Sequence, residues 1–530
     1  MRLTSRINAL LLAGLLVWGA PLSALGASGL EAAGTPEAAA AGSASSLGAA
    51  PVSGDGTLNN LYWQIQPQGV QYAFSKGLTD EQIARKNVEN LNKALAWAAG
   101  SGPEAGLKYS GGKTFVKLER GSYLLDGQHS RVYSVSDRSV SVPSNIDLDL
   151  NRSTLMQIPN EKEGYALFTV VGSENVGIGN GTLVGEKDRH RYTGKGTHEF
   201  GFGIDVRGGT NIRLVNMDIY NMTGDSIIIG GKDTYLSRGG TISRSVLIDG
   251  CRLHDNRRQG ITVMGGRDIT IENSAIYNIG VSNGTDPRCG IDLENELDWP
   301  IENVTIRGNR FYNNSKGAVL VHRGTKYTAI ENNTVQGKLV LVYGEHTAIE
   351  NNDVSDGGIY SVDTSEPVYT VIRNNRLQNA SIEIAKNSNT VVTDNKLTGG
   401  AIKFNYSTGV IYRNTVANPG KTAAKFGIQV YADQQMPGSF HVYMADNTVS
   451  GPYIKQYAVS NTSRLTVTTD PAVVEALASG PADMIDSPDT PIPMGPEPQK
   501  KDDTPAVIAG AAALALLSAA AVFYKKKKRP

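Results

Sequence analysis

Little in this 530-residue chain can crosslink it or give it a net charge. Its two cysteines, Cys251 and Cys289, are too few for a disulfide framework, and each is expected to be a small buried residue rather than a bond or metal ligand. Basic and acidic residues number 51 each, so the net charge is zero and nothing indicates a nucleic-acid partner. Only 10 Phe against 59 Gly favours a thin, strand-rich core with tight turns over a helical globule.

A column of asparagines is the strongest pattern that the chain does have. Segments of the form apolar-x-polar-Asn-x-apolar recur at intervals of roughly 19 to 24 residues, with one longer gap before the last. The central residues are Asn309, Asn333, Asn352, Asn375, Asn395, Asn414 and Asn447. Each segment is rich in Val, Ile and Thr and lacks helical periodicity, which predicts two strands around a corner where stacked asparagines hydrogen-bond to one another. The predicted fold is all-β, a parallel β-helix of about 12 coils, with Cys251 in the same column.

One helix is predicted before the first coil. Thr79 and Gln82 have the spacing of a capping box, apolar residues recur at helical intervals from Ile83 to Ala98, and Gly100 ends the run. Because a solenoid end exposes an open sheet edge, this amphipathic helix is expected to cap the β-helix domain, which is assigned to residues 57–465.

The two ends of the chain predict an exported protein with a membrane anchor. The first 26 residues have two arginines, an apolar stretch and small residues, as in a secretory signal peptide, and the Ala, Gly and Ser-rich residues 27–56 read as a disordered leader. An extension with a flexible spacer is expected over 466–505. Residues 506–524 carry no charge and are just long enough to span a bilayer, and the basic tail 525–530 would stay cytoplasmic.

The cap, the repeats and the segment from Lys117 to Tyr123 (KLERGSY) resemble the right-handed parallel β-helix proteins of the pectate-lyase-like superfamily. The resemblance covers nearly all of residues 57–465 and implies a carbohydrate-active protein. It names no reaction, because that superfamily includes pectate lyases, polygalacturonases, alginate epimerases and phage tailspike glycosidases. The Asn-Thr-Asp, Asp-Asp and Gly-His-Gly pattern of polygalacturonases is absent from the coils. The Asp-Pro-His-Asp motif of alginate epimerases has only a partial counterpart in Asp286-Pro287-Arg288.

Three long insertions predict where a site lies. The coils before Asn309 carry insertions at about residues 185–201, 231–243 and 280–288, and insertions on one side of a solenoid form the walls of a groove. Residues that alternate with the core positions of the adjoining strands are expected to point out to solvent. They are Asp205, Arg207, Thr262, Asp292 and Glu294.

Asp292 and Glu294 are the predicted catalytic pair. They lie two residues apart on one strand face, with backbones about 6.5 to 7 Å apart, which suits the acid and base of an inverting glycosidase. Asp205 is about three coils away, on the order of 14 Å, and would serve a separate subsite. Asp225, directly before its strand, is the reserve acid.

Three arginines, Arg257, Arg258 and Arg288, indicate a second chemistry. Arg258 and Arg288 take equivalent places two residues before a strand glycine, so they are expected to lie beside one another and to share an anion. A substrate carboxylate in that place would make the protein a uronate lyase or C5-epimerase. No cofactor is required, although the acidic residues that follow, Glu296 and Asp298, could complete a Ca²⁺ site.

His198 and Glu199 end the first insertion and could overhang the groove, and Trp299 could pack against a sugar ring. The resulting interpretation is a cell-surface glycoside hydrolase acting on a polysaccharide or oligosaccharide. A lyase or epimerase is the first alternative, and a non-catalytic glycan-binding adhesin is the second. The glycan, the linkage and the oligomeric state are not predicted.

Overall fold

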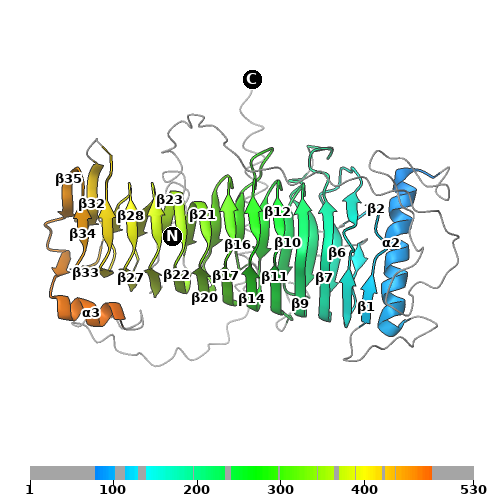
Figure 1. Cartoon of the computed structure of the whole chain (residues 1–530), viewed down its shortest axis with the longest axis horizontal. Coiled ribbons are helices and arrows are strands. Elements are labelled where there is room, and N and C mark those ends of the chain that lie inside the picture. The colour runs from blue at the N-terminus through cyan, green and yellow to red at the C-terminus, as the bar shows by residue number, and fades with distance from the viewer. Residues whose placement is uncertain are drawn as a thin grey trace, which may run out of the picture. The chain divides into compact units, whose positions relative to one another are not determined.

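Stacked coils of short parallel strands make up most of the part of the chain that the structure describes, as the computed structural model in Figure 1 shows. The structure describes residues 78–101, 114–128, 139–194, 196–232, 240–295, 299–342, 344–362, 369–387, 389–420, 424–435 and 437–479. All of them belong to one compact unit, Ser46–Pro530.

Every coil contributes strands to three parallel rows. The first row is β1 (Thr114–Lys117), β4 (Ile146–Asp149), β7 (Glu174–Val184), β9 (Thr210–Tyr220), β11 (Ser243–Asp249), β14 (Gly266–Glu272), β17 (Ile301–Arg307), β20 (Thr325–Glu331), β22 (Glu345–Glu350), β24 (Thr370–Arg373), β27 (Thr390–Thr393), β30 (Gly409–Tyr412), β33 (Phe440–Ala445) and β36 (Leu465–Thr468). The second is β2 (Ser122–Leu125), β5 (Thr154–Gln157), β7, β9, β12 (Arg252–His254), β15 (Ala275–Tyr277), β18 (Arg310–Tyr312), β21 (Thr334–Val342), β23 (Asp353–Val362), β25 (Arg376–Gln378), β28 (Lys396–Thr398), β31 (Thr415–Ala417) and β34 (Thr448–Ser450). The third is β3 (Val140–Ser141), β6 (Gly164–Val171), β8 (Phe200–Arg207), β10 (Asp225–Gly230), β13 (Gln259–Val263), β16 (Cys289–Leu293), β19 (Gly317–Val321), β21, β23, β26 (Ser381–Ala385), β29 (Ile402–Asn405), β32 (Ala424–Tyr431) and β35 (Tyr453–Val459). The predicted parallel β-helix is confirmed.

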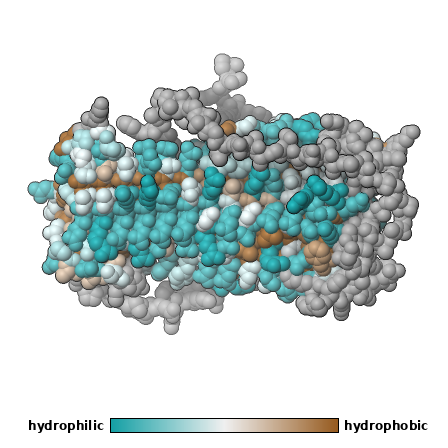
Figure 2. Space-filling model, viewed as in Figure 1, coloured by the Kyte–Doolittle hydropathy of each residue, from teal (hydrophilic) through white to brown (hydrophobic). Residues whose placement is uncertain are grey.

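The interior of the coils is a continuous apolar core. Alternate residues of each strand point inward, so Ile204, Ile261 and Ile291, which pair across β8, β10, β13 and β16, are all fully buried. The outward face in Figure 2 is mostly hydrophilic, with a narrow apolar stripe along part of it. This is the alternation expected of strands with one buried face.

The predicted asparagine ladder is present at the corner between the first and second rows. Each Asn side chain donates to the Asn side-chain oxygen of the next coil, at 3.1 Å from Asn309 to Asn333 and at 3.0 Å at every further step to Asn447. The same oxygens accept from backbone amides, as that of Asn375 does from Asn352 at 2.9 Å. Ser274 and Cys251 continue the column in earlier coils. Burial raises the pKa of Cys251 to about 12, which leaves an unreactive wall residue, as predicted.

Replacing Asn352 with Leu is expected to lower the free energy of unfolding by about 1–3 kcal/mol, because the amides and carbonyls that it satisfies are buried. The thermal midpoint measures the loss. Asn351→Gly is the matched control, since the adjacent Asn351 is exposed and has φ 57, which glycine adopts freely. Equal midpoints for Asn352→Leu and the wild type would contradict a structural role for the ladder.

One helix caps the first coil, and another lies beside the last coils (Figure 1). Helix α2 (Asp80–Ala96) begins with the predicted capping box, in which Thr79 and Gln82 exchange hydrogen bonds of 2.9 and 3.2 Å. A π-helical turn (Trp97–Ser101) follows, and Gly100 has φ 88 there. Buried residues of α2 join the core of the first coils, which confirms the cap. At the other end, α3 (Pro471–Ser479) packs Val474 against the outer side of β27, β30 and β33. The folded region therefore continues beyond the predicted boundary at residue 465.

The prediction of a membrane-anchored surface protein is corrected. Within the ranges that the structure describes, no helix has the length and apolar character needed to cross a membrane. The segments assigned to the signal peptide (1–26), leader (27–56), span (506–524) and tail (525–530) lie outside the described residues.

Candidate functional site

The candidate site lies on the outer face of the third row, from β8 to β19. Strand register places Asp205, Ile228, Thr262 and Asp292 at equivalent positions of four successive coils. Asp205 and Asp292 are therefore three coils apart, as predicted. Asp225 starts β10 and pairs in register with Gln259, so it lies three positions before Ile228 along the strand and two coils from Asp292.

The prediction that these outward side chains are solvent-exposed is wrong for most of them. Asp292 is 0% exposed and Asp205 is 1% exposed, and Arg207 and Thr262 are buried as well. Among the predicted outward residues, Glu294 is the exception, with 33% of its side chain accessible. The cause is lateral packing: Asp292 is enclosed by Gln259 and His322 of the neighbouring coils, and Asp205 is held by Arg207 of its own strand.

Asp225 is a buried carboxyl with a raised pKa. It accepts hydrogen bonds from Arg258 at 3.0 Å and from Thr262 at 2.8 Å, while its second oxygen is buried without a partner among the described residues. Complete burial raises the pKa of Asp225 to about 6; Arg258 and Thr262 oppose this change, and the negative charges of Asp292 and Glu199 add to it. Asp225 is thus a carboxyl that holds its proton to an unusually high pH.

Arg258 connects Asp225 to the solvent-facing part of the site. Its side chain is largely buried, and its other terminal nitrogen lies 3.9 Å from Glu294. Burial alone would lower the pKa of Arg258, but the surrounding carboxylates raise it above its ordinary value, so it is a fixed positive charge. Two carboxyls in different environments thus flank one guanidinium.

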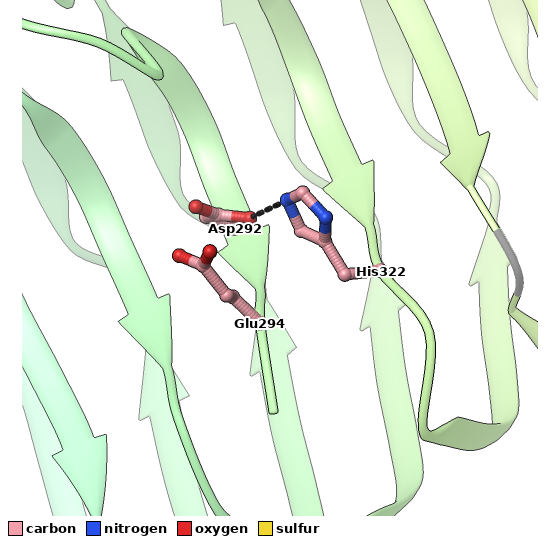
Figure 3. Close-up of side chains that lie close together, drawn as sticks. All are labelled: Asp292, Glu294 and His322. Atoms are coloured by element: carbon pink, nitrogen blue, oxygen red, sulfur yellow. Dashed lines mark ion pairs between the residues drawn. The ribbon is translucent and has the colours of Figure 1, made fainter. Parts of the chain in front are cut away.

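Asp292, Glu294 and His322 form a second cluster (Figure 3). Asp292 and Glu294 project from the same strand, and His322 follows the neighbouring strand β19 with its imidazole directed at Asp292. Asp292 Oδ1 lies 3.2 Å from His322 Nε2, and Asp292 Oδ2 accepts from Gln259 at 2.6 Å. Burial by itself would lower the pKa of His322. The contact with Asp292 and its negative charge outweigh this effect, so the pKa of His322 is raised above its usual value.

His322 is the residue that sequence reasoning missed. Because Leu293 pairs with Val321, Glu294 and His322 occupy equivalent positions of adjacent coils. Extending the alignment of Gly290–Glu294 by one coil would have placed His322 beside the predicted pair.

The geometry also corrects the prediction of an inverting pair. One carboxylate oxygen from each of Asp292 and Glu294 and a ring nitrogen of His322 all lie within 4.8 Å of one another. Inverting glycosidases need about 6.5–9.5 Å between their carboxyls. The two side chains point towards each other, so their carboxyl oxygens lie closer together than the backbone spacing of the two residues suggests.

Arg257 and His198 take part in hydrogen bonds that hold the insertions in place, and they do not line an open groove. Arg257 donates to the carbonyls of Thr197 at 2.9 Å and His198 at 3.0 Å in the first insertion, and to Asn283 at 2.9 Å in the third. His198 is 2% exposed, and its Nδ1 is 2.9 Å from His190, which contacts buried Glu186 at 2.7 Å. Substrate binding through the His198 side chain therefore has no support in its surroundings.

The predicted pairing of the two arginines and the predicted subsite role of Asp205 both meet other partners in the structure. Arg288 pairs with Asp286 at 2.7 Å, whereas Arg258 holds Asp225, so the two arginines do not share an anion. Asp205 is held by Arg207 at 2.5 Å in a buried pair of its own. In both cases a nearer partner, within two residues or on the adjacent coil, satisfies the charge.

The remaining candidates lie at the margins of the site. Glu199 is half-buried and accepts from Thr285 at 3.2 Å, which links the first and third insertions near Asp225. Trp299 is half-buried and packs against an apolar patch of Ala166, Phe202, Ile228 and Met264. The proposed Ca²⁺ ligands Glu296 and Asp298 lie outside the described residues.

Fold and repeats define a right-handed solenoid protein. The family model "Right handed beta helix region" matches residues 163–337 and 323–470, and the chain belongs to that family.

One similar sequence is the uncharacterized protein YclG of Bacillus subtilis (strain 168), 31% identical over 270 residues, which are 49% of this chain and 44% of YclG. The match thus spans less than half of that relative's length. Among solved structures, the mannuronan C-5 epimerase AlgE4 A-module of Azotobacter vinelandii is 15% identical with a TM-score of 0.43, covering 72% of this chain and 96% of that one. The tailspike protein of E. coli bacteriophage HK620, in complex with a pentasaccharide, is 12% identical with a TM-score of 0.48, covering 77% of each chain. Structural similarities with such low sequence identity and TM-scores do not indicate a reaction for this chain.

Proposed function

We propose that the protein is a carbohydrate-active enzyme that cleaves a polysaccharide or oligosaccharide, and that the reaction is glycoside hydrolysis. The observation that carries the proposal is the contrast between Asp225 and Glu294 on either side of Arg258. Asp225 has a pKa raised to about 6, while Glu294 faces solvent beside a fixed positive charge. A carboxyl with a raised pKa suits the general acid of glycoside hydrolysis, and a second, solvent-facing carboxylate near it suits the base or nucleophile.

In this mechanism Asp225 donates a proton to the leaving glycosidic oxygen, and Glu294 acts as the ionised carboxylate opposite it. Arg258 keeps both carboxyls in place. Asp292 acts by orienting His322, whose Nε2 lies 3.2 Å from Asp292 Oδ1. Asp225 is buried, so substrate access requires the side chains that enclose it to move.

A uronate lyase or epimerase is the second candidate, favoured by one observation. His322, 31% exposed and held by Asp292, is a group that can exchange a proton with a sugar carbon acid. The arginines support this reaction less well, since Arg258 and Arg288 already bind carboxylates of the chain itself.

The products distinguish these reactions. The full chain is incubated with a panel of neutral and uronate-containing polysaccharides, and both reducing ends and ultraviolet absorbance are recorded. Hydrolysis adds reducing ends alone, whereas a lyase also creates an absorbing double bond. New double bonds would replace the hydrolase with the lyase, and glycan binding with neither product would indicate a non-catalytic adhesin.

A further inference from the structure

A divalent cation fits between Asp292, Glu294 and His322. Their donor set is two carboxylates and one imidazole, with the three potential ligand atoms within 4.8 Å of one another. We propose that these residues bind a transition-metal ion of the Zn²⁺ or Mn²⁺ type. This inference goes beyond the proposed function, because it concerns ion binding and holds with or without a glycan substrate.

The contact between Asp292 and His322 is the first argument. Asp292 Oδ1 and His322 Nε2 are 3.2 Å apart, yet within the described ranges neither atom makes a hydrogen bond. Two neighbouring ligands that share one ion at about 2.0–2.2 Å, in tetrahedral or octahedral geometry, lie about 2.8–3.6 Å from each other. The separation therefore suits a shared ion, whereas the orientation does not suit a hydrogen bond.

The burial of Asp292 is the second argument. Its side chain is 0% exposed, and a buried carboxylate oxygen without a partner is costly. Gln259 donates to Oδ2 at 2.6 Å and so fixes the carboxylate with Oδ1 turned towards His322. Metal-binding carboxylates are commonly oriented by such an outer hydrogen bond.

The third ligand and the open positions lie towards solvent. Glu294 is one-third exposed, and its rotatable side chain can bring an oxygen closer to the other two ligand atoms. An ion held by three protein groups keeps at least one position for water or substrate.

The imidazole selects the type of ion. Ca²⁺ prefers six to eight oxygen ligands, and one histidine with two carboxylates supplies too few. Nitrogen and carboxylate together suit Zn²⁺ or Mn²⁺. The proposed ion site therefore includes His322 and differs from the predicted Ca²⁺ site, whose ligands Glu296 and Asp298 lie outside the described residues.

Calorimetric titration of the chelator-treated full chain with Zn²⁺ tests the proposal without any substrate. We expect one ion per chain in the wild type, and an affinity at least about a hundredfold lower in His322→Ala and in Glu294→Gln. Circular dichroism confirms that each variant is folded. His346→Ala is the matched control, because His346 packs between Tyr327 and Tyr369 and should leave binding unchanged.

Absence of Zn²⁺ binding in the wild type, or wild-type affinity in His322→Ala, would overturn the ion site. So would tighter binding of Ca²⁺ than of Zn²⁺. A failure of glycan cleavage alone would leave these binding results unaffected, so the ion site and the proposed hydrolase can fail separately.

Discussion

Asp225→Asn and Glu294→Gln are each expected to lower kcat by at least about a hundredfold while the β-helix stays folded. Both substitutions keep the shape of the side chain and remove its ability to exchange a proton. Asp225 would lose the proton that its raised pKa retains, and Glu294 would lose its negative charge beside Arg258. The measurement is kcat on the glycan that the wild type cleaves, with thermal midpoints recorded in parallel.

Glu272→Gln is the control for these variants. Glu272 lies on β14 in the first row, where its side chain binds Arg307 at 2.6 Å on the surface. Its loss should leave kcat unchanged. Full activity in both Asp225→Asn and Glu294→Gln would place the reaction elsewhere on the molecule.

Arg258→Met is expected to lower the free energy of unfolding by about 3–5 kcal/mol near pH 8, because it leaves Asp225 buried without its counterion. Arg258 is also one of the groups that lower the pKa of Asp225, so that pKa rises further in the variant. At pH 5, below the wild-type Asp225 pKa of about 6, Asp225 is already mostly protonated, so the loss of Arg258 lowers the free energy of unfolding by less. The destabilisation should therefore be larger at pH 8 than at pH 5.

Denaturant unfolding at the two pH values measures this difference. Arg288→Met is the matched control, because its partner Asp286 is 73% exposed, and such pairs contribute at most about 1 kcal/mol. Equal losses for Arg258→Met at pH 5 and pH 8 would mean that Asp225 does not change charge between them.

The features that repeat along the chain could be predicted from the sequence. The asparagine ladder, the place of Cys251 in it and the capping box of α2 all follow from spacing. Such features depend on local geometry that is the same in every coil. Strand alternation likewise gave the correct outward face for Asp205 and Asp292.

The surroundings of individual side chains could not be predicted in the same way. Alternation says which face a residue occupies but not what covers it, so the burial of Asp292 under Gln259 and His322 was missed. Charged side chains pair with the nearest opposite charge. A sequence does not show that Arg288 pairs with Asp286 while Arg258 pairs with Asp225. His322 follows the next strand, β19, one coil beyond the strands whose alignment indicates the outward residues.

The pH dependence of kcat tests most directly the central claim, that a protonated Asp225 drives glycoside cleavage. Asp225 is ionised above its pKa of about 6, so kcat should fall as the pH rises through that value and should be largest on the acid side. A kcat that is constant from pH 5 to pH 8, or that rises through pH 6, would contradict Asp225 as the proton donor.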